Sequence, residues 1–262
     1  MKHVTSLLAA ASVLVLIPSF ARSQFASSVV AYERGAGFSP NFTNANAALG
    51  APAVGSGITP FSPPFSANQI VSIGAGGWLT LQLGTPILNQ PSDPFGIDFL
   101  IFGNSFFVVT NGTGASAQTS GAIFTSSLST RVEVSSDGST WFMLDPSRAP
   151  TVGTLFPTDG TGNAQLPVNP SLSSADFGGL GLAGIRALYN GSAGGAGFDL
   201  SWARDGDGNA VDLASANFVR IDVLNGRTQI DAISVVPEPS VAALLVFGLM
   251  LFRFRAREAR IL

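Results

Sequence analysis

The sequence predicts an all-β fold, an antiparallel β-sandwich, for residues 22–236 of the 262-residue chain. Short segments in which apolar and polar residues alternate are typical of strands with one buried face. Turn-forming Gly, Asn, Asp and Pro separate these segments, and no segment has the period of an amphipathic helix. Many short strands joined by turns are the pattern of a sandwich.

The first part of this region is the least regular. Residues 25–68 contain one expected short strand, at 29–32, and one expected helical turn, at 44–49. Two apolar segments then follow, at 70–73 and 78–83, on either side of a glycine-rich turn. Because the second segment alternates cleanly, this pair predicts a β-hairpin with one face in the core.

The middle of the region gives the clearest strand signals. Residues 97–102 are apolar on both faces except at Asp98, which is typical of a central strand covered on both sides. Residues 131–135 alternate, the Ser-Asp-Gly-Ser sequence 136–139 can turn, and 140–144 return. These three segments predict a second hairpin.

The last part combines a long loop with several further strands. Apolar pairs at 108–109 and 123–124 flank a Thr/Ser/Gly loop, and residues 145–196 are expected to be mostly loop with a short helix near 173–177. Order is expected to resume in four segments, at 198–202, 211–213, 218–223 and 229–235.

The N-terminus has the pattern of a secretory signal peptide, residues 1–21. Lys2 and His3 precede an apolar run, residues 7–17, and a small-residue site follows it. We therefore expect export through the Sec translocon and cleavage by signal peptidase after Ala21, with Ala26 as the alternative.

The C-terminus, residues 237–262, is a second membrane-directed segment. Its apolar run 241–252 carries no charge and predicts a transmembrane helix, although a spanning helix usually has about 20 apolar residues. Four arginines follow the run: Arg253, Arg255, Arg257 and Arg260. By the positive-inside rule they keep the tail in the cytoplasm and place residues 22–236 outside the inner membrane. The alternative is a buried helix of a soluble domain, in which these arginines would be poorly placed.

Pro237, Glu238 and Pro239 stand directly before this apolar run. A Pro-Glu-Pro motif, an apolar segment and an arginine cluster, in this order at the C-terminus, resemble the PEP-CTERM sorting signal of exopolysaccharide-producing Gram-negative bacteria. The resemblance implies that an exosortase, a membrane protease, recognises and processes the tail. It also implies a location in the envelope, at the cell surface or in the biofilm matrix of a Gram-negative bacterium.

Residues 22–236 resemble a group of uncharacterised exported proteins that carry this signal. The matching stretches are 48–50, 76–81, 98–102, 132–138, 197–200 and 218–221. More loosely, the hairpin at 131–144 and the later Val-Arg-Ile strand resemble galactose-binding-like jelly rolls of the discoidin and carbohydrate-binding type. The likeness implies a jelly-roll-like sandwich.

Composition limits the chemistry of residues 22–236. The chain has no cysteine, and its only histidine and lysine are His3 and Lys2, within the signal peptide. This excludes Ser-His-Asp and Cys-His nucleophiles, Schiff-base chemistry and the usual zinc sites. The acidic balance and the lack of a basic stripe argue against nucleic-acid binding. We expect a protein that is not an enzyme and that folds without disulfides.

One loop has the spacing of a calcium site. Oxygen-bearing side chains stand at Asp205, Asp207, Asn209 and Asp212. Alternate oxygen ligands suit a hard cation, but Ala210 replaces the glycine and Ala216 the bidentate acid of an EF-hand loop. The alternative is a turn built from Asp, Gly and Asn.

Two further sets of side chains are candidates for glycan chemistry. Sugar rings can stack on aromatic planes, and three tryptophans are candidates for this contact: Trp78, Trp141 and Trp202. A sandwich core would bury the same residues. Asp98 and Asp199 lie in apolar strands and could be buried, hydrogen-bonded carboxylates or site residues. A glycosidase would need two such carboxylates facing each other.

The sequence therefore predicts an exported, exosortase-processed protein of the cell surface or matrix that acts by binding or structure. Two alternatives stay open, a carbohydrate-binding module that contacts polysaccharide and an Asp-based glycan hydrolase.

Overall fold

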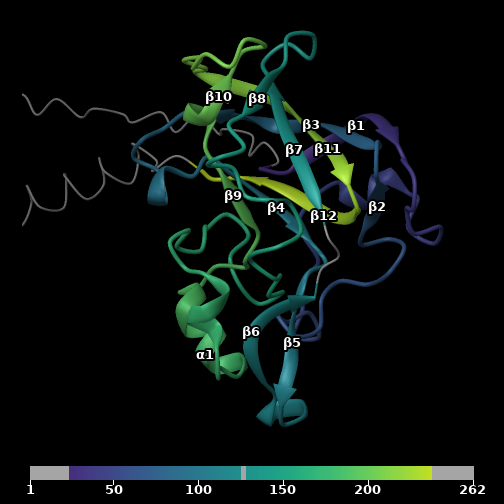
Figure 1. Cartoon of the computed structure of the whole chain (residues 1–262). Coiled ribbons are helices and arrows are strands. Elements are labelled where there is room, and N and C mark those ends of the chain that lie inside the picture. The colour runs from purple at the N-terminus through teal and green to yellow at the C-terminus, as the bar shows by residue number, and fades with distance from the viewer. Residues whose placement is uncertain (1–23, 125–127, 238–262) are drawn as a thin grey trace, which may run out of the picture.

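The computed structural model describes residues 24–124 and 128–237 (Figure 1). Nearly all of its strand pairs are antiparallel, in sheets of six, four and two strands. The two larger sheets form the layers of a sandwich, and the main hydrophobic core draws side chains from both. The mostly antiparallel architecture confirms the predicted all-β class.

The element bounds are as follows. The six-stranded sheet has the order β1 (Ala26–Glu33), β3 (Trp78–Leu88), β11 (Ser215–Asn225), β7 (Ser129–Ser135), β8 (Phe142–Leu144) and β10 (Ala203–Arg204). The four-stranded sheet has the order β2 (Val71–Gly74), β12 (Arg227–Val235), β4 (Phe99–Gly103) and β9 (Ala196–Phe198). The third sheet pairs β5 (Phe106–Asn111) with β6 (Gln118–Phe124). The helical elements are η1 (Ala45–Ala48), η2 (Pro94–Gly96), η3 (Gly114–Ser116), η4 (Ser174–Phe177), α1 (Leu182–Tyr189) and η5 (Leu200–Trp202).

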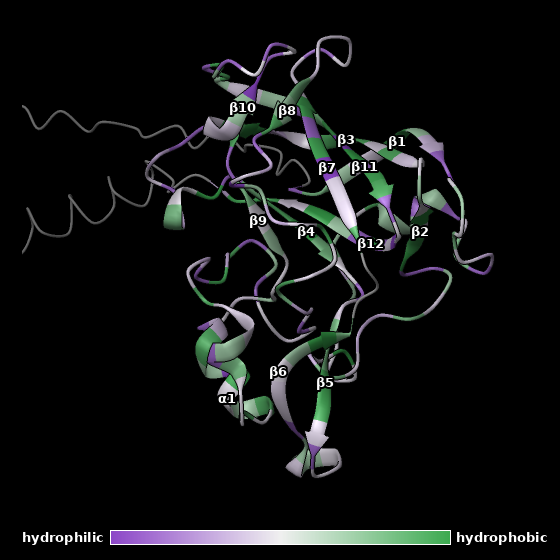
Figure 2. Cartoon of the chain, in the orientation of Figure 1, coloured by the Kyte–Doolittle hydropathy of each residue, from purple (hydrophilic) through white to green (hydrophobic). Residues whose placement is uncertain are grey.

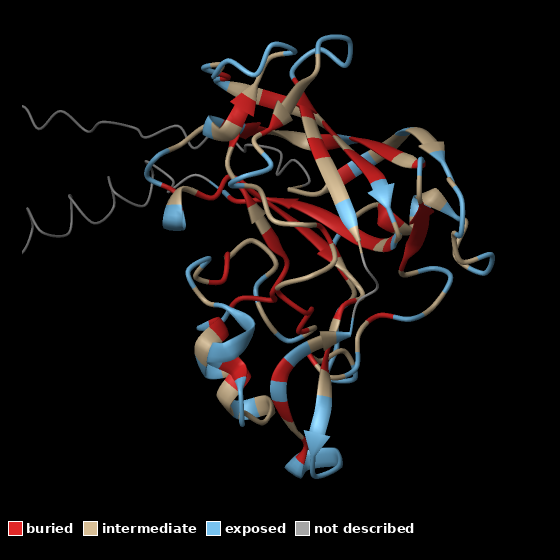
Figure 3. Ribbon diagram, viewed as in Figure 1, coloured by how far each residue is buried: buried red, intermediate tan, exposed pale blue. Residues whose placement is uncertain are grey.

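The main core follows from alternation along the strands. In β3, Leu79 and Leu81 are fully buried, and in β11 Ile221 is fully buried. Burying each such side chain stabilises the fold by about 1.5 to 3 kcal/mol. In β4 and β12, apolar colouring in Figure 2 coincides with buried segments in Figure 3. The six-stranded sheet therefore has one face in the core and one face that carries polar side chains.

Strand β4 is apolar on both faces because both faces are covered. Phe99 and Ile101 point into the main core, whereas Leu100 and Phe102 belong to a second cluster with Ala232. β4 lies between β12 and β9. This confirms the prediction of a central strand at 97–102.

The predicted pairing of 70–73 with 78–83 is wrong. β2 pairs with β12, whereas β3 pairs with β1 and β11 in the other sheet. The glycine-rich turn therefore carries the chain from one layer to the other. A Cβ at Gly74 would lie 2.1 Å from the Ala36 carbonyl oxygen, so the glycine permits close approach of the neighbouring backbone.

The predicted hairpin at 131–144 is confirmed as β7 and β8. Its turn is held by the Asp137 carboxylate, which accepts hydrogen bonds from the amides of Ser139 and Thr140, each 2.8 Å long. These bonds hold the pKa of Asp137 below its usual range.

A smaller unit lies beside the sandwich, and we call it the helical lobe. It comprises β5, β6, η4, α1 and the loops between them that carry its own aromatic core (Figure 1). The short helix expected near 173–177 is present as η4, but the sequence did not predict α1. The segment 145–196 is therefore only partly loop.

Within the described residues, no helix has the length and apolarity needed to cross a membrane. The expected signal peptide and the expected helix at 241–252 lie outside those residues.

Candidate functional site

The sorting motif begins where the sandwich ends. β12 stops at Val235, Val236 is buried and donates its amide to the Asp98 carbonyl oxygen at 2.9 Å, and Pro237 is exposed. Glu238, Pro239 and the four arginines lie outside the described residues. The folded region thus closes one residue before the Pro-Glu-Pro sequence.

The N-terminal end of the domain is hydrogen-bonded both to β12 and to β3. The Val235 amide donates to the Gln24 carbonyl oxygen at 2.7 Å, and the Gly84 amide donates to the Phe25 carbonyl oxygen at 2.9 Å. Ala26 is buried. The two ends of the described domain therefore meet side by side.

The predicted calcium loop is closed by its own hydrogen bonds. The Asp205 carboxylate accepts from the amides of Asp207 at 3.0 Å and Asn209 at 2.8 Å. These bonds lower the pKa of Asp205. Asp207, Asn209 and Asp212 are exposed, and residues 24–124 and 128–237 contain no cluster of three acidic, His or Cys side chains placed to hold a metal. The geometry is that of an Asx turn.

The three tryptophans do not form one platform. Trp78 pairs with Asp222 near one end of the six-stranded sheet, and the guanidinium of Arg220 lies 4.9 Å from its ring centroid. Trp141 precedes β8, near the opposite end. Trp202 lies in η5, packs against both sandwich clusters and carries Arg148 at 5.3 Å from its ring.

Asp98 is a buried, hydrogen-bonded carboxylate. It accepts from the amides of Gln90 at 3.1 Å and Leu200 at 2.7 Å. Burial raises its pKa to about 7, and the nearby carboxylates of Asp199 and Asp93 add to this effect. These bonds join the loop before β4 to the segment after β9.

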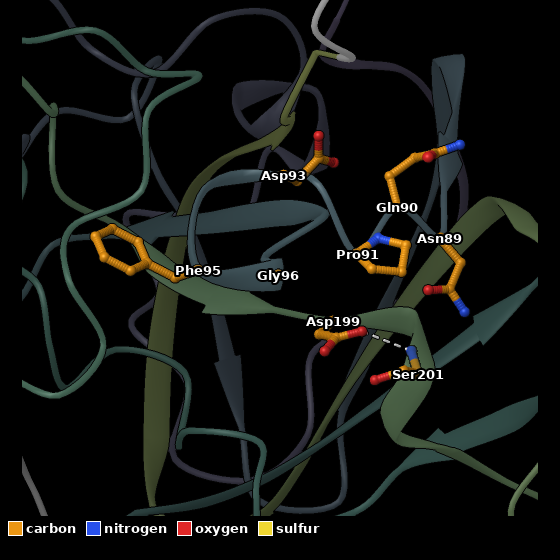
Figure 4. A pocket seen from close by; sticks show the side chains of 8 residues that line it. All are labelled: Asn89, Gln90, Pro91, Asp93, Phe95, Gly96, Asp199 and Ser201. Carbon is orange, nitrogen blue, oxygen red and sulfur yellow. Dashed lines mark hydrogen bonds between the residues drawn. The ribbon is translucent and has the colours of Figure 1, made fainter.

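A first hollow, which we call the acidic hollow, opens next to Asp98. It has a volume of about 420 Å³, and Asp93, Asp199 and Phe95 are among its lining residues (Figure 4). The Asp199 carboxylate accepts from the Ser201 amide at 2.7 Å and so caps η5. Asp98 does not line the hollow. The Asp98 and Asp199 carboxylates thus both serve local backbone structure.

A second hollow, which we call the aromatic hollow, has a volume of about 360 Å³. Two phenylalanine pairs line it. Phe42 and Phe65 come from the loops before β2, with ring centroids 5.1 Å apart. Phe106 and Phe124 come from the β5–β6 hairpin and stack with centroids 4.8 Å apart. Phe65 is 68% exposed and Phe124 is 64% exposed.

Polar groups complete the lining of the aromatic hollow. Arg227 and Gln229, from the start of β12, line it together with Asn104. The Gln229 amide donates to the Ser39 hydroxyl at 3.3 Å, and the Arg227 guanidinium donates to the Gly37 carbonyl oxygen at 3.4 Å. These contacts attach the N-terminal loop to β12. The arrangement can hold an amphipathic ligand, with an apolar face against the rings and polar groups at the strand.

The sequence predictions missed the aromatic hollow. Its phenylalanines are distant in the chain and lie in loops or at the ends of strands, so no periodic pattern joins them. The one local signal is the abundance of phenylalanine, with 20 in the chain against 3 tryptophans.

No protein-family model matches the chain, and no curated protein is significantly similar to it.

Proposed function

We propose that the protein is an exported, exosortase-processed component of a Gram-negative cell surface or matrix, and that it acts by binding or structure. The observation that carries this proposal is the position of the Pro-Glu-Pro sequence. β12 is central in the four-stranded sheet and is complete at Val235, and Pro237 follows one buried residue later. A cut after Pro237 therefore leaves every described strand in the domain.

The same geometry suits a protein with two membrane-directed ends. Gln24 and Val235 are hydrogen-bonded, so a signal peptide before residue 22 and a helix after residue 240 would be attached to the domain at neighbouring points. Both segments could lie in one membrane without disturbing the sheets. Proline at 237 and 239 would keep the intervening chain extended, the form in which a protease binds a segment.

Mass spectrometry of the protein from its native host tests this proposal. We expect an N-terminus at Arg22 and a C-terminus between residues 237 and 240 in the surface-exposed population. A terminus at Ser27 is not expected, because cleavage after Ala26 would remove the backbone bonds of Gln24 and Phe25. Recovery of a surface peptide covering residues 253–262 would show a permanent anchor and overturn the sorting proposal.

We also propose that the sandwich is a jelly roll of the galactose-binding-like kind. The support is the strand order, in which β11 lies between β3 and β7 and late strands take central places in both sheets. An experimental structure that aligned with another sandwich topology would refute this assignment.

The aromatic hollow favours glycan binding as the specific form of the binding role. Exposed aromatic rings beside amide and guanidinium groups match the two chemical faces of a sugar. The predicted alternative, an Asp-based hydrolase, receives less support because Asp98 and Asp199 are bonded to backbone amides. Polysaccharide digestion followed by reducing-end assay distinguishes the two, and any turnover lost in Asp199→Asn would favour the hydrolase.

A further inference from the structure

We propose that the aromatic hollow binds an acidic polysaccharide, a chain of pyranose units that carry carboxylates. This inference names the ligand class for the binding role proposed above and rests on that role. Three features of the hollow carry it: the exposed rings, the polar groups beside them and the sign of the charge.

The rings are the first feature. Eight large hydrophobic side chains of the described residues are conspicuously exposed, and two of them, Phe65 and Phe124, line this one hollow. Exposed apolar groups that gather in a concavity indicate a ligand surface. Each ring packs against a second one, Phe42 or Phe106, and is thereby held in place before any ligand arrives. An aromatic ring suits the apolar C–H face of a pyranose.

The polar groups are the second feature. Asn104, Gln229 and Ser39 line the hollow and supply amide and hydroxyl groups for sugar hydroxyls. Thr228, between Arg227 and Gln229, donates its hydroxyl to the Val152 carbonyl oxygen at 3.4 Å. A hydrogen-bonded strand thus presents the polar side of the hollow, and such a preorganised surface loses little entropy on binding.

Charge is the third feature and selects the ligand. Arg227 is the only charged side chain among the lining residues of the aromatic hollow, and no carboxylate lines it. This contrasts with residues 24–236, where carboxylates outnumber arginines. An acidic ligand would be repelled over much of the domain but would meet a guanidinium here, which can bond a carboxylate through two N–H groups. The acidic hollow, lined by Asp93 and Asp199, has the opposite preference.

Titration calorimetry on the full chain in detergent tests the proposal with two matched ligands. One is an oligogalacturonate, and the other is its methyl ester, which has the same rings but no charge. We expect the acid to bind at least about tenfold more tightly than the ester, because a charge-assisted hydrogen bond exceeds the 1.4 kcal/mol that corresponds to a factor of ten. The preference should weaken as salt is added.

Variants separate the three features. Arg227→Gln should abolish the preference for the acid, so that this variant binds the acid and the ester with equal affinity. Phe65→Ala and Phe124→Ala should each lower the affinity for both ligands about tenfold. The matched control is Phe95→Ala, which removes a ring that is 58% exposed and lines the acidic hollow instead. It should bind both ligands like the unaltered chain.

Several results would overturn the proposal. They are equal affinity for acid and ester, failure of both to bind, and equal losses in Phe95→Ala and Phe65→Ala. Because calorimetry needs no processing of the tail, a negative binding result leaves the sorting proposal standing. Conversely, an uncut tail in the host would contradict the sorting proposal but would not affect a positive binding result.

Discussion

The sandwich and the helical lobe are held together by different kinds of side chain. Between the two large sheets the core is mainly aliphatic, with residues such as Leu79 and Ile221 that recur along strands. In the helical lobe the core is mainly aromatic: Phe107 lies against Phe177 with centroids 4.7 Å apart, and Tyr189 packs edge-on to Phe177. The main core and the lobe core have no buried residue in common.

Two buried carboxylates, one in each region, have different hydrogen-bond partners. In the sandwich, Asp231 is 2% exposed and receives a hydrogen bond from the Ala53 amide, and burial raises its pKa to about 7. In the lobe, Asp159 is equally buried but bonds Arg186 through both oxygens, at 2.6 and 3.0 Å. Although burial alone would raise it, the pKa of Asp159 is lowered, by these bonds and those from Thr161. The two carboxylates thus differ in their partners, which are a backbone amide for Asp231 and an arginine and a threonine for Asp159.

The largest effect is expected from Phe177→Ala, which removes the ring at the centre of the lobe core. Phe177 is fully buried, so the cavity should cost about 3 to 5 kcal/mol. Because the two cores are separate, we expect the loss of stability to be confined to the lobe. Hydrogen exchange should accelerate in β5, β6 and α1, while β3 and β11 keep their protection. Phe95→Ala is the control, and equal acceleration in β11 would show that the two regions unfold as one unit.

The second-largest effect is expected from Asp231→Asn, which removes a buried carboxylate of the sandwich. The pKa of Asp231 is raised from its usual value, so its contribution to stability is complete below about pH 4 and is lost as pH rises through about 7. Each pKa unit corresponds to about 1.4 kcal/mol, which gives up to roughly 4 kcal/mol across this range. Asp98 has the same sign and range. Asp231→Asn should therefore flatten the decline in unfolding free energy between pH 5 and 8.

Urea denaturation at several pH values measures this decline. Asp207→Asn is the matched control, because Asp207 is exposed. Carboxylates with a lowered pKa, such as Asp159, lose their contribution only as pH falls below about 4, outside the window. Parallel curves for Asp231→Asn and the unaltered chain would contradict the assignment.

Regular alternation along the sandwich strands explains how much of the fold could be predicted from the sequence. Alternation at 131–135 and the two-sided apolar run at 97–102 predicted β7 and β4, because strand periodicity records which faces are buried. It does not record which strand is the neighbour. The segments before and after the glycine turn at 74–77 therefore resembled a hairpin although they belong to opposite sheets.

The candidate sites were harder to predict because the sequence pattern does not record which residues become neighbours in space. Residue type alone marks the tryptophans as candidates, but Trp78 and Trp202 are each covered by an arginine and lie in different parts of the fold. The aromatic hollow joins Phe42, which precedes β2, to Phe124, the last residue of β6, so only the tertiary structure brings its members together. α1 was missed because glycine and proline around it resemble a loop.

A smaller effect is expected from Arg186→Gln, which tests the specific contacts of the lobe. The substitution removes two bonds to Asp159 but leaves those from the Thr161 amide and hydroxyl, at 3.1 and 2.8 Å. A buried charge that loses a partner costs about 1 to 3 kcal/mol, and the partial exposure of Arg186 favours the lower end. Thermal unfolding measures the loss. Arg34→Gln, at an exposed position, is the control, and an equal change in both variants would show that the ion pair contributes nothing to the lobe.

The smallest effect is expected at the loop 205–212, on the sandwich side of the comparison. Because the Asp205 carboxylate already accepts both backbone amides, the turn can close without a metal. We expect the same melting temperature in calcium and in chelator, and a cost below about 0.5 kcal/mol for the exposed Asp207→Ala. Asp205→Ala, which removes the turn's own acceptor, should cost more. A bound calcium ion would instead add about 2.7 kcal/mol at one hundred times its dissociation constant, and Asp207→Ala would abolish the gain. That result would show a calcium site in the loop 205–212. The spacing of the oxygen-bearing side chains in the sequence predicts such a site, whereas the hydrogen bonds of the turn do not.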